Sequence, residues 1–379
     1  MWLTEKVSPT RLAIGIDVHG EKCVAYALYA GQNEPSRKQQ AFIEAFNQDF
    51  RRFPSDAGGM ASLSKRLGKS NEVGILIENS TKSHDVYWML TSLGYEVVVA
   101  HATDLYLITK SVSKNDDKDA EKLAGYMRRR MNGEVEFSES FIPDKTWMRR
   151  RESCRILADG NDDLAAVKKQ MRMHLMLNGQ GTRRSYSNIA CAEALQELKG
   201  MGDTNLAILA AKAEKIKEFC LFIEKTIRLE FMECRMFDII YSIPGFGVYS
   251  AAYLASMIVD IGRFDSGRKL ASSIGIRPKQ HDSADKGPNC GITRRGDPLT
   301  RKLVYQATFV HVNNCPDSFV TKKFERLKGK GKAQKEALVA ASNSMMVMIY
   351  SMIKNDREFI ADPEVLAKCR AQSKELCSE

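Results

Sequence analysis

The sequence lacks closely spaced cysteine pairs. Its nine cysteines are scattered along 379 residues, and no two have the close spacing of a zinc-binding knuckle. They are odd in number and lie mostly in helix-like or apolar segments, so we expect reduced structural thiols. The cysteines are Cys23, Cys154, Cys191, Cys220, Cys234, Cys290, Cys315, Cys369 and Cys377. This pattern argues against a disulfide scaffold and favours a cytoplasmic protein.

Signals for secretion and membrane insertion are missing as well. Residues 1–6 lack the apolar core of a signal peptide, and no uninterrupted apolar run reaches the roughly 20 residues that cross a bilayer. We therefore expect an intracellular protein with no membrane segment.

Negative charge is in short supply. The chain carries 57 Lys and Arg against 47 Asp and Glu, a net charge of +10, and the excess lies mainly downstream of residue 125. A basic balance favours a polyanionic partner, nucleic acid before membrane. A nucleic-acid partner would be consistent with a place at the nucleoid, although a merely soluble basic protein would have the same balance.

Carboxylates occur at three informative places in the N-terminal third. Residues 14–17 and 75–78 are short apolar runs that end in Asp17 and Glu78, which is typical of buried strands that deliver an acid to a sheet edge. Residues 114–124 predict a helix start, where Asp116 and Asp119 share a face. Four such acids can converge on Mg²⁺ or Mn²⁺, and paired ions can clamp the attacking and leaving oxygens of a phosphodiester.

Two alternatives stay open for these acids. Any one of them, taken alone, is more simply explained as a surface charge or a helix cap. Asp117 competes with Asp116 as the first helical acid, although the spacing to Asp119 favours Asp116.

The element order points to a mixed α/β domain over residues 1–144. Hydrophobic patterning predicts strands at 11–18, 22–30 and 40–47, a helix at 56–67, a strand at 73–78, a helix at 84–93, a strand at 95–100 and a helix from residue 116. A tight turn at 19–21 joins the first two strands. The order is that of the ribonuclease H-like (RuvC-like) fold, and the acids fall on its first strand, fourth strand and last helix.

Residues 145–235 predict a helical segment. Leu209, Ile216 and Ile223 recur every seven residues, each followed four residues later by a second apolar side chain (Ala213, Cys220 and Ile227). We call this the heptad seam, and it predicts a helical hairpin or a subunit-joining coiled coil. The apolar stripe Leu164, Val167, Met171 and Leu175 faces either a core or a dimer partner. A loop at 178–188 carries Arg183, Arg184 and Tyr186, which suit phosphate contact and base stacking.

Residues 236–379 predict a mainly helical C-terminal domain. The run 243–247 (Ile-Pro-Gly-Phe-Gly) before a small-residue helix is typical of half a helix–hairpin–helix, in which Gly245 and Gly247 would hold a phosphate. Helices are predicted near 298–313 and 333–354. The loop expected between them is strongly basic, which indicates contact with a nucleic-acid backbone or a solvated linker. Its lysines are Lys322, Lys323, Lys328, Lys330 and Lys332.

Six motifs in this order resemble one family: the DEDD-type insertion-sequence transposases with a C-terminal serine-bearing transposase domain. This family includes bridge-RNA-guided DNA recombinases and the related pilin-gene invertases. The motifs are residues 15–18 (Gly-Ile-Asp-Val), the strand ending in Glu78, the Lys-x-Asp-x-x-Asp-Ala pattern at 114–120, the run 243–247, residues 278–283 (Pro-Lys-Gln-His-Asp-Ser) and residues 294–296 (Arg-Arg-Gly). The resemblance spans nearly the whole chain.

The resemblance implies a role for each matching position. Asp17, Glu78, Asp116 and Asp119 match the metal-binding tetrad, and Ser283 matches the nucleophile that forms a covalent phosphoserine link to DNA. Arg294 and Arg295 would contact nucleic acid. The chain departs from the family after Val18, after Glu78, and at residues 282–285, where one serine and no glycine remain.

The resulting hypothesis is a metal-dependent DNA recombinase, guided by a structured RNA from its own element. Asp17 and Ser283 are far apart in sequence, so the site must be assembled between domains, and the resemblance implies assembly between subunits of a homodimer or homotetramer. A junction-resolving nuclease or a protein-guided invertase would also explain the acids and the basic residues. An inactive DNA-binding regulator would leave the intact acids and serine without a role.

Overall fold

The chain forms two compact units, residues 1–142 and 143–379. The computed structural model describes residues 11–68, 72–100, 116–134, 139–183, 185–277, 292–293 and 296–377, with the side chains of 116, 117 and 373–377 left aside. The division falls next to the boundary predicted at residue 144. The further separation of 145–235 from 236–379 as domains stays a prediction.

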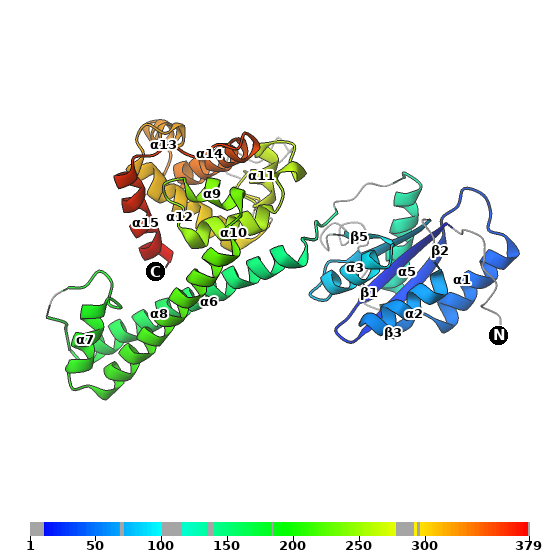
Figure 1. The fold of residues 1–379 in the computed structure, drawn as a ribbon, viewed down its shortest axis with the longest axis horizontal. Coiled ribbons are helices and arrows are strands. Elements are labelled where there is room, and N and C mark those ends of the chain that lie inside the picture. Colours follow the sequence, from blue (N-terminus) through cyan, green and yellow to red (C-terminus); the bar gives the residue numbers. More distant parts are fainter. Residues whose placement is uncertain are drawn as a thin grey trace. The chain divides into compact units, whose positions relative to one another are not determined.

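The first unit is a five-stranded sheet between helices (Figure 1). Its elements are β1 (Leu12–Val18), β2 (Lys22–Tyr29), α1 (Arg37–Asp49), β3 (Arg52–Pro54), α2 (Ala57–Leu67), β4 (Val73–Glu78), α3 (Ser83–Ser92), β5 (Glu96–Ala100) and α5 (Asp116–Met131). The strand order is β3-β2-β1-β4-β5, with β2 antiparallel to β1 and with β4 and β5 parallel to it. This mixed α/β architecture is consistent with the expected ribonuclease H-like fold.

Alternating side chains divide the sheet into two faces. Leu12, Ile14 and Ile16 belong to a core with residues of α1, α2 and α3. Ala13 belongs to a second core with residues of α5. Because successive residues of a strand point to opposite faces, α1, α2 and α3 cover one face and α5 covers the other.

One predicted strand is wrong. Residues 40–47 lie within the helix α1, not in a strand. The helix begins at a capping box formed by Ser36 and Gln39, and it buries Ile43 and Phe46, which lie three residues apart. The third strand is instead the short β3, paired with β2. The other strands and helices predicted in this unit are confirmed within one or two residues.

The second unit is mostly helical. It contains α6 (Lys145–Leu177), α7 (Ala192–Gly200), α8 (Thr204–Glu230), α9 (Arg235–Tyr241), α10 (Val248–Ile258), the 3₁₀ turn η1 (Ile261–Arg263), α11 (Gly267–Ser273), α12 (Pro298–Asn314), α13 (Phe319–Gly329), α14 (Gln334–Lys354) and α15 (Pro363–Cys377). Helices α6 and α8 pack along each other as a long hairpin (Figure 1).

The heptad seam of α8 packs within its own chain. Leu209, Ala213 and Ile216 join a core with the predicted apolar stripe of α6, and Ile227 joins the C-terminal core. The stripe at 164–175 therefore faces a core, as one of the two interpretations expected. The hairpin uses the seam that would otherwise be available for joining subunits.

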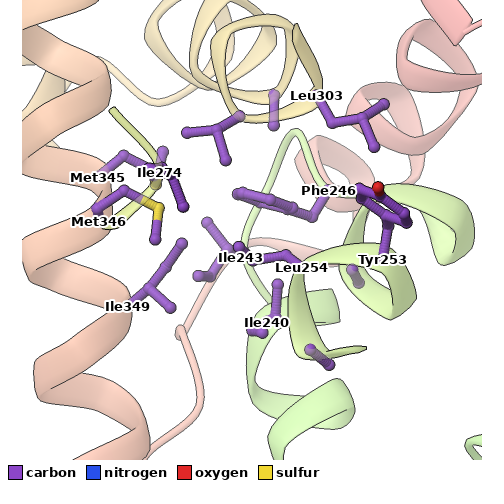
Figure 2. Close-up of a cluster of buried hydrophobic side chains, with 14 of the residues drawn as sticks. Ile240, Ile243, Phe246, Tyr253, Leu254, Ile274, Leu303, Met345, Met346 and Ile349 are labelled. Carbon is purple, nitrogen blue, oxygen red and sulfur yellow. The ribbon is translucent and has the colours of Figure 1, made fainter. Parts of the chain in front are cut away.

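The C-terminal core is built around the turn between α9 and α10. Phe246 is fully buried and lies among side chains of α10 and α12, with Ile243 facing Met345, Met346 and Ile349 of α14 (Figure 2). By length and composition α14 could cross a membrane, but it packs in this core, and 44% of its apolar window is buried. The seven cysteines whose side chains are described are all free thiols, as predicted.

The basic run at 322–332 was predicted as a loop, and this is wrong for most of it. Residues 319–329 form α13, which begins at the Ser318 cap and buries Val320 and Phe324 four residues apart. Charged residues occupy the other faces. The apolar spacing is short and is interrupted by charges, so only packing against α14 makes the helix evident.

Candidate active site and nucleic-acid contacts

Asp17 and Glu78 lie at the same edge of the sheet. They are on adjacent parallel strands, and Ile16 of β1 is in register with Ile77 of β4, so the next residues, Asp17 and Glu78, are neighbours. Both share the α5 face by alternation, Asp17 with Ala13 and Glu78 with Leu76. The prediction that two strands bring these acids to one edge agrees with this register.

Two strand glycines let α5 approach the sheet closely. A Cβ on Gly15 would lie 2.2 Å from both the carbonyl oxygen of Ala120 and the amide nitrogen of Ala124. A Cβ on Gly74 would lie 2.3 Å from Cε of Met127. Gly15 has no room for a side chain, because it meets backbone atoms that cannot move aside, whereas Gly74 meets only the flexible ends of methionine side chains.

These contacts also fix the direction of α5. Met127 lies against Gly74, near the start of β4, whereas Ala120 lies against Gly15, two residues before Asp17. The helix therefore runs with its N-terminus toward the strand ends that carry the acids. Asp119 precedes Ala120, and Asp116 is the first residue of α5, so both belong to the end of the helix nearest that edge.

The local electrostatics of the edge are mixed. The Asp17 side chain is 18% exposed, and its Oδ2 lies 3.2 Å from Nε2 of His19. The pKa of the neighbouring Cys23 thiol is raised to about 12, chiefly by burial and also by the charge of Asp17, with Lys82 partly offsetting both effects. Asp119 is 39% exposed and pairs with Lys122 at 3.0 Å.

The donor chemistry of this edge suits a hard divalent cation, since carboxylate oxygens are the ligands that Mg²⁺ prefers. Among the side chains that the structure describes, no three acids, histidines or cysteines are grouped as a metal site. The side chain of Asp116 is outside that set, as is that of Asp117. Asp17 and Glu78 nevertheless lie at one edge, and their carboxylates match the expected donor type.

Several predicted residues lie outside the described part of the chain. These are Ser283, Arg184, Arg294 and Arg295. The structure does place the residues on either side of the serine segment: Thr293 donates its N–H to the carbonyl of Arg277 at 3.0 Å. Gly296, with φ +87°, packs against the backbone of Ser273, because a Cβ there would lie 2.2 Å from the Ser273 carbonyl oxygen.

The Pro-Gly turn at 243–247 is a packed structural element. Gly245 has φ +107°, and a Cβ there would lie 2.2 Å from the carbonyl oxygen of Ala307 on α12. The Gly247 N–H donates to Oγ of Ser250 at 2.9 Å. Buried His311 contacts the Pro244 carbonyl through Nδ1 at 2.9 Å. The packing against α12 accounts for Gly245 without a bound phosphate.

The predicted basic contacts differ in exposure. Lys322, Lys328, Lys330 and Lys332 are exposed, and within the described residues Lys322 and Lys330 form no ion pair. Lys323 is half-buried and donates to Oγ of Ser344 at 2.7 Å, and burial followed by the Arg326 charge lowers its pKa. Lys323 is therefore tied to α14, whereas its neighbours remain accessible to an anionic backbone.

The loop at 178–188 is held by Glu197 of α7. The Arg183 backbone N–H donates to Oε1 of Glu197, and the Tyr186 hydroxyl donates to Oε2 at 2.8 Å. The Arg183 side chain is exposed, but Tyr186 is partly buried and tethered. Arg183 thus remains available for phosphate contact, while Tyr186 has a structural partner.

Gly15 is a positioning residue that we did not predict, although its motif was noted. It lies in the middle of an apolar strand, where glycine weakens a strand unless another backbone approaches closely. That local signal was present in the sequence. The identity of the approaching helix, more than 100 residues away, was not.

Comparison with known proteins matches both halves of the chain. Residues 14–177 match the DEDD transposase model of the IS110 group, and residues 238–322 match the model described as transposase IS116/IS110/IS902 family. The first match includes Asp17, Glu78, Asp116 and Asp119, and the second lies in the C-terminal half. Together the two models cover about two thirds of the chain.

Curated relatives agree with the family models. The chain is 30% identical over 125 residues to the transposase for insertion sequence element IS1111A of Coxiella burnetii, covering 32% of this chain and 33% of that protein. It is 28% identical over 126 residues to the pilin gene-inverting protein of Moraxella lacunata, covering 32% and 38%.

A longer alignment, over 300 residues, joins the chain at 21% identity to the putative transposase y4qE of Sinorhizobium fredii, covering 79% of this chain and 71% of that protein. The chain thus spans about a third of the length of the first two relatives and most of the third. With two models of one transposase group matching in order, one of them over the segment that carries the four acids, the chain belongs to the IS110/IS116 family of insertion-sequence transposases.

Proposed function

We propose that this protein is a DNA transposase that cuts and rejoins strands with metal-bound carboxylates and a serine nucleophile. The single observation that carries the proposal is the close packing of α5 on Gly15, which directs the N-terminus of α5 to the sheet edge that holds Asp17 and Glu78. The family membership supports action on DNA.

Asp17, Glu78, Asp116 and Asp119 would hold the divalent ions, Mg²⁺ or Mn²⁺. When bound, such ions supply Lewis-acid stabilisation of charge on the phosphate oxygens. The protein's part is to keep the carboxylates ionised and fixed. The register of β1 with β4 fixes two of them, and the contact of Ala120 with Gly15 fixes the helix that carries the others.

Ser283 would attack the scissile phosphorus. Its Oγ–H bond breaks, an Oγ–P bond forms, and the phosphodiester bond to the departing strand breaks, so that strand leaves with a free hydroxyl after taking up a proton. The reverse attack by the hydroxyl of another strand restores a phosphodiester and frees the serine. Neither step consumes an external energy source, because the number of phosphoester bonds is unchanged.

The proposal extends to partners. A structured RNA encoded by the element would guide target choice, bound by shape and backbone contacts that weaken with salt. A homodimer or homotetramer would bring together acids and serine from different units. Apolar side chains on the outer face of α8 suit such an assembly: Phe219, Phe222 and Leu229 are 45%, 66% and 69% exposed.

The acids are tested by Asp17→Asn. This variant should lose Mg²⁺-dependent strand cleavage while keeping its fold and its DNA binding. Glu44→Gln is the matched control, because Glu44 is an exposed acid on α1 that contacts Gln40 within the same helix. Cleavage by Asp17→Asn at the wild-type rate would refute the metal assignment.

The serine is tested by covalent trapping. With end-labelled nicked DNA, the wild-type protein should give a slow, protease-sensitive band on a denaturing gel, and Ser283→Ala should give none while still binding DNA. Cleavage by Ser283→Ala would favour the nuclease alternative. RNA that copurifies with the protein from the full element should be enriched in one species, whereas random host RNA would favour a protein-guided invertase.

A further inference from the structure

A cavity lies between α12 and α14. Its volume is about 570 Å³, within the range of small-ligand sites. The lining residues are Ile276, Ile292, Arg301, Lys302, Tyr305, Gln306, Phe309, Lys335, Val339 and Ser342. Tyr305 and Phe309 are four residues apart on α12, so they share a face, and Val339 faces them from α14.

The charged residues described in the lining of this cavity are all cations. They are Arg301, Lys302 and Lys335, and Lys302 also pairs with Asp162 at 3.4 Å. Arg301 is held in place by the carbonyls of Ile274 and Gly296, at 3.2 and 3.0 Å. Lys335 is exposed and, within the described residues, forms no ion pair. An apolar, aromatic interior thus opens beside fixed and exposed positive charge.

We propose that this cavity takes up one unstacked nucleobase of the DNA substrate. The proposal rests on the proposed function. The base would enter between Tyr305 and Val339, stack on an aromatic ring, and leave its flanking phosphates beside Arg301, Lys302 and Lys335. Stacking is tolerant of sequence because every base has a π-face, which suits an enzyme whose sequence choice is made elsewhere.

The charge pattern argues against an apolar peptide as the occupant. An apolar side chain would fill the interior but would offer no anion to the exposed Lys335 at its edge. A nucleotide suits both the apolar interior and the positive edge of the cavity, since the base is apolar on its faces and the phosphate is anionic. The basic residues from Lys328 to Lys332 come directly before Lys335 in the chain. They would extend the positive charge along a bound DNA strand.

Ile276 and Ile292 connect this cavity to the proposed chemistry. They are the described apolar residues at either end of the chain segment that carries Ser283, and both line the cavity. A base held here would anchor the strand close in sequence to the proposed nucleophile. Binding a base and cutting a strand are separate events, so the two proposals can fail independently.

The test measures binding of the full chain to short fluorescent duplexes without divalent metal, so that no strand is cut. One duplex carries a single unpaired thymidine, and a second carries an abasic residue at that position. The wild-type protein should bind the first about tenfold more tightly. Phe309→Ala and Val339→Trp, which remove a stacking ring and fill the cavity, should abolish this preference.

Phe319→Ala is the matched control, because Phe319 is 51% exposed on α13 and does not line the cavity. It should keep the preference. Lys335→Gln should weaken binding of both duplexes alike. Equal binding of thymidine and abasic duplexes by the wild type would overturn the proposal, as would an unchanged preference in both Phe309→Ala and Val339→Trp. Tighter binding of the same bulge in RNA would assign the cavity to RNA instead.

The binding assay stays informative if the proposed function is wrong. Loss of cleavage in every assay together with a retained thymidine preference would refute strand transfer and keep the base site. Strand transfer with no thymidine preference would refute the base site and keep the proposed strand transfer.

Discussion

Substituting Gly15 with alanine should damage stability and activity together. The added methyl carbon would lie 2.2 Å from the Ala120 oxygen and the Ala124 nitrogen, whereas ordinary contact begins at 3.4 Å. These two atoms belong to residues four apart, the spacing of one backbone hydrogen bond within α5. Neither atom can rotate away as a flexible side chain would, so α5 must move outward by about 1 Å.

The magnitude follows from this displacement. Overpacking of a tight contact costs about 1–3 kcal/mol of unfolding free energy. A shift of about 1 Å in catalytic groups can reduce a rate by roughly 10²-fold. Gly15→Ala should therefore lower the denaturant midpoint at unchanged slope, and it should reduce Mg²⁺-dependent cleavage by more than the loss of folded protein explains.

Two other glycines provide matched comparisons. Gly125 lies on α5 with nothing within 4 Å of an added Cβ, so Gly125→Ala should stabilise the helix by about 0.5–1 kcal/mol and leave cleavage unchanged. Gly74→Ala would meet the flexible ends of Met127 and Met131, at 2.3 and 2.9 Å, and should cost less than Gly15→Ala. Wild-type stability and cleavage in Gly15→Ala would refute the argument that close packing of α5 positions the acids.

Three further predictions concern the second unit. Gly245→Ala should lower the unfolding free energy by about 1–3 kcal/mol, because Gly245 has φ +107° and its added Cβ would lie 2.2 Å from the Ala307 oxygen. Gly329→Ala is the control, because an added Cβ there would meet open space. Equal denaturant midpoints for the two variants would contradict the packing described for the turn. Burial lowers the pKa of His311 below its ordinary value of 6.5. Below pH 6.5 the unfolded chain therefore binds a proton at this histidine that the folded chain does not, and the unfolding free energy should fall as the pH drops. His311→Gln should flatten this fall, and an unchanged slope would exclude His311 as its cause. Phe222→Ser, at a 66% exposed position of α8, should weaken self-association in sedimentation experiments without lowering stability; unchanged association would remove this face from the proposed assembly.

The sequence alone located the acids at strand ends and predicted most elements. Strands β1 and β4 contain nearly continuous apolar runs that lead into Asp17 and Glu78, a pattern typical of strands buried on both faces. The heptad seam of α8 likewise required a long helix with a buried face. These features are local, because the 2-residue and 3.6-residue periods are set by the backbone itself.

Two segments were assigned wrongly because their local patterns fit more than one structure. Residues 40–47 hold Phe42, Ile43 and Phe46, a short apolar set that suits a strand as well as a helix. The basic run that becomes α13 has few apolar residues to show a period. In both, the helix is defined by the surface against which Ile43 or Phe324 packs, and that surface comes from distant residues.

Only the tertiary structure decided what each buried face contacts. The apolar face predicted for α8 needed a surface to pack against, and that surface is α6 of the same chain. Glycine in β1 permitted a close approach, and the approaching element is α5. The cavity between α12 and α14 brings together side chains as far apart in the sequence as Ile276 and Ser342, and these residues do not form a motif. A sequence pattern shows that a face must be buried, but the choice among possible partners depends on shape complementarity between elements, which local periods do not encode.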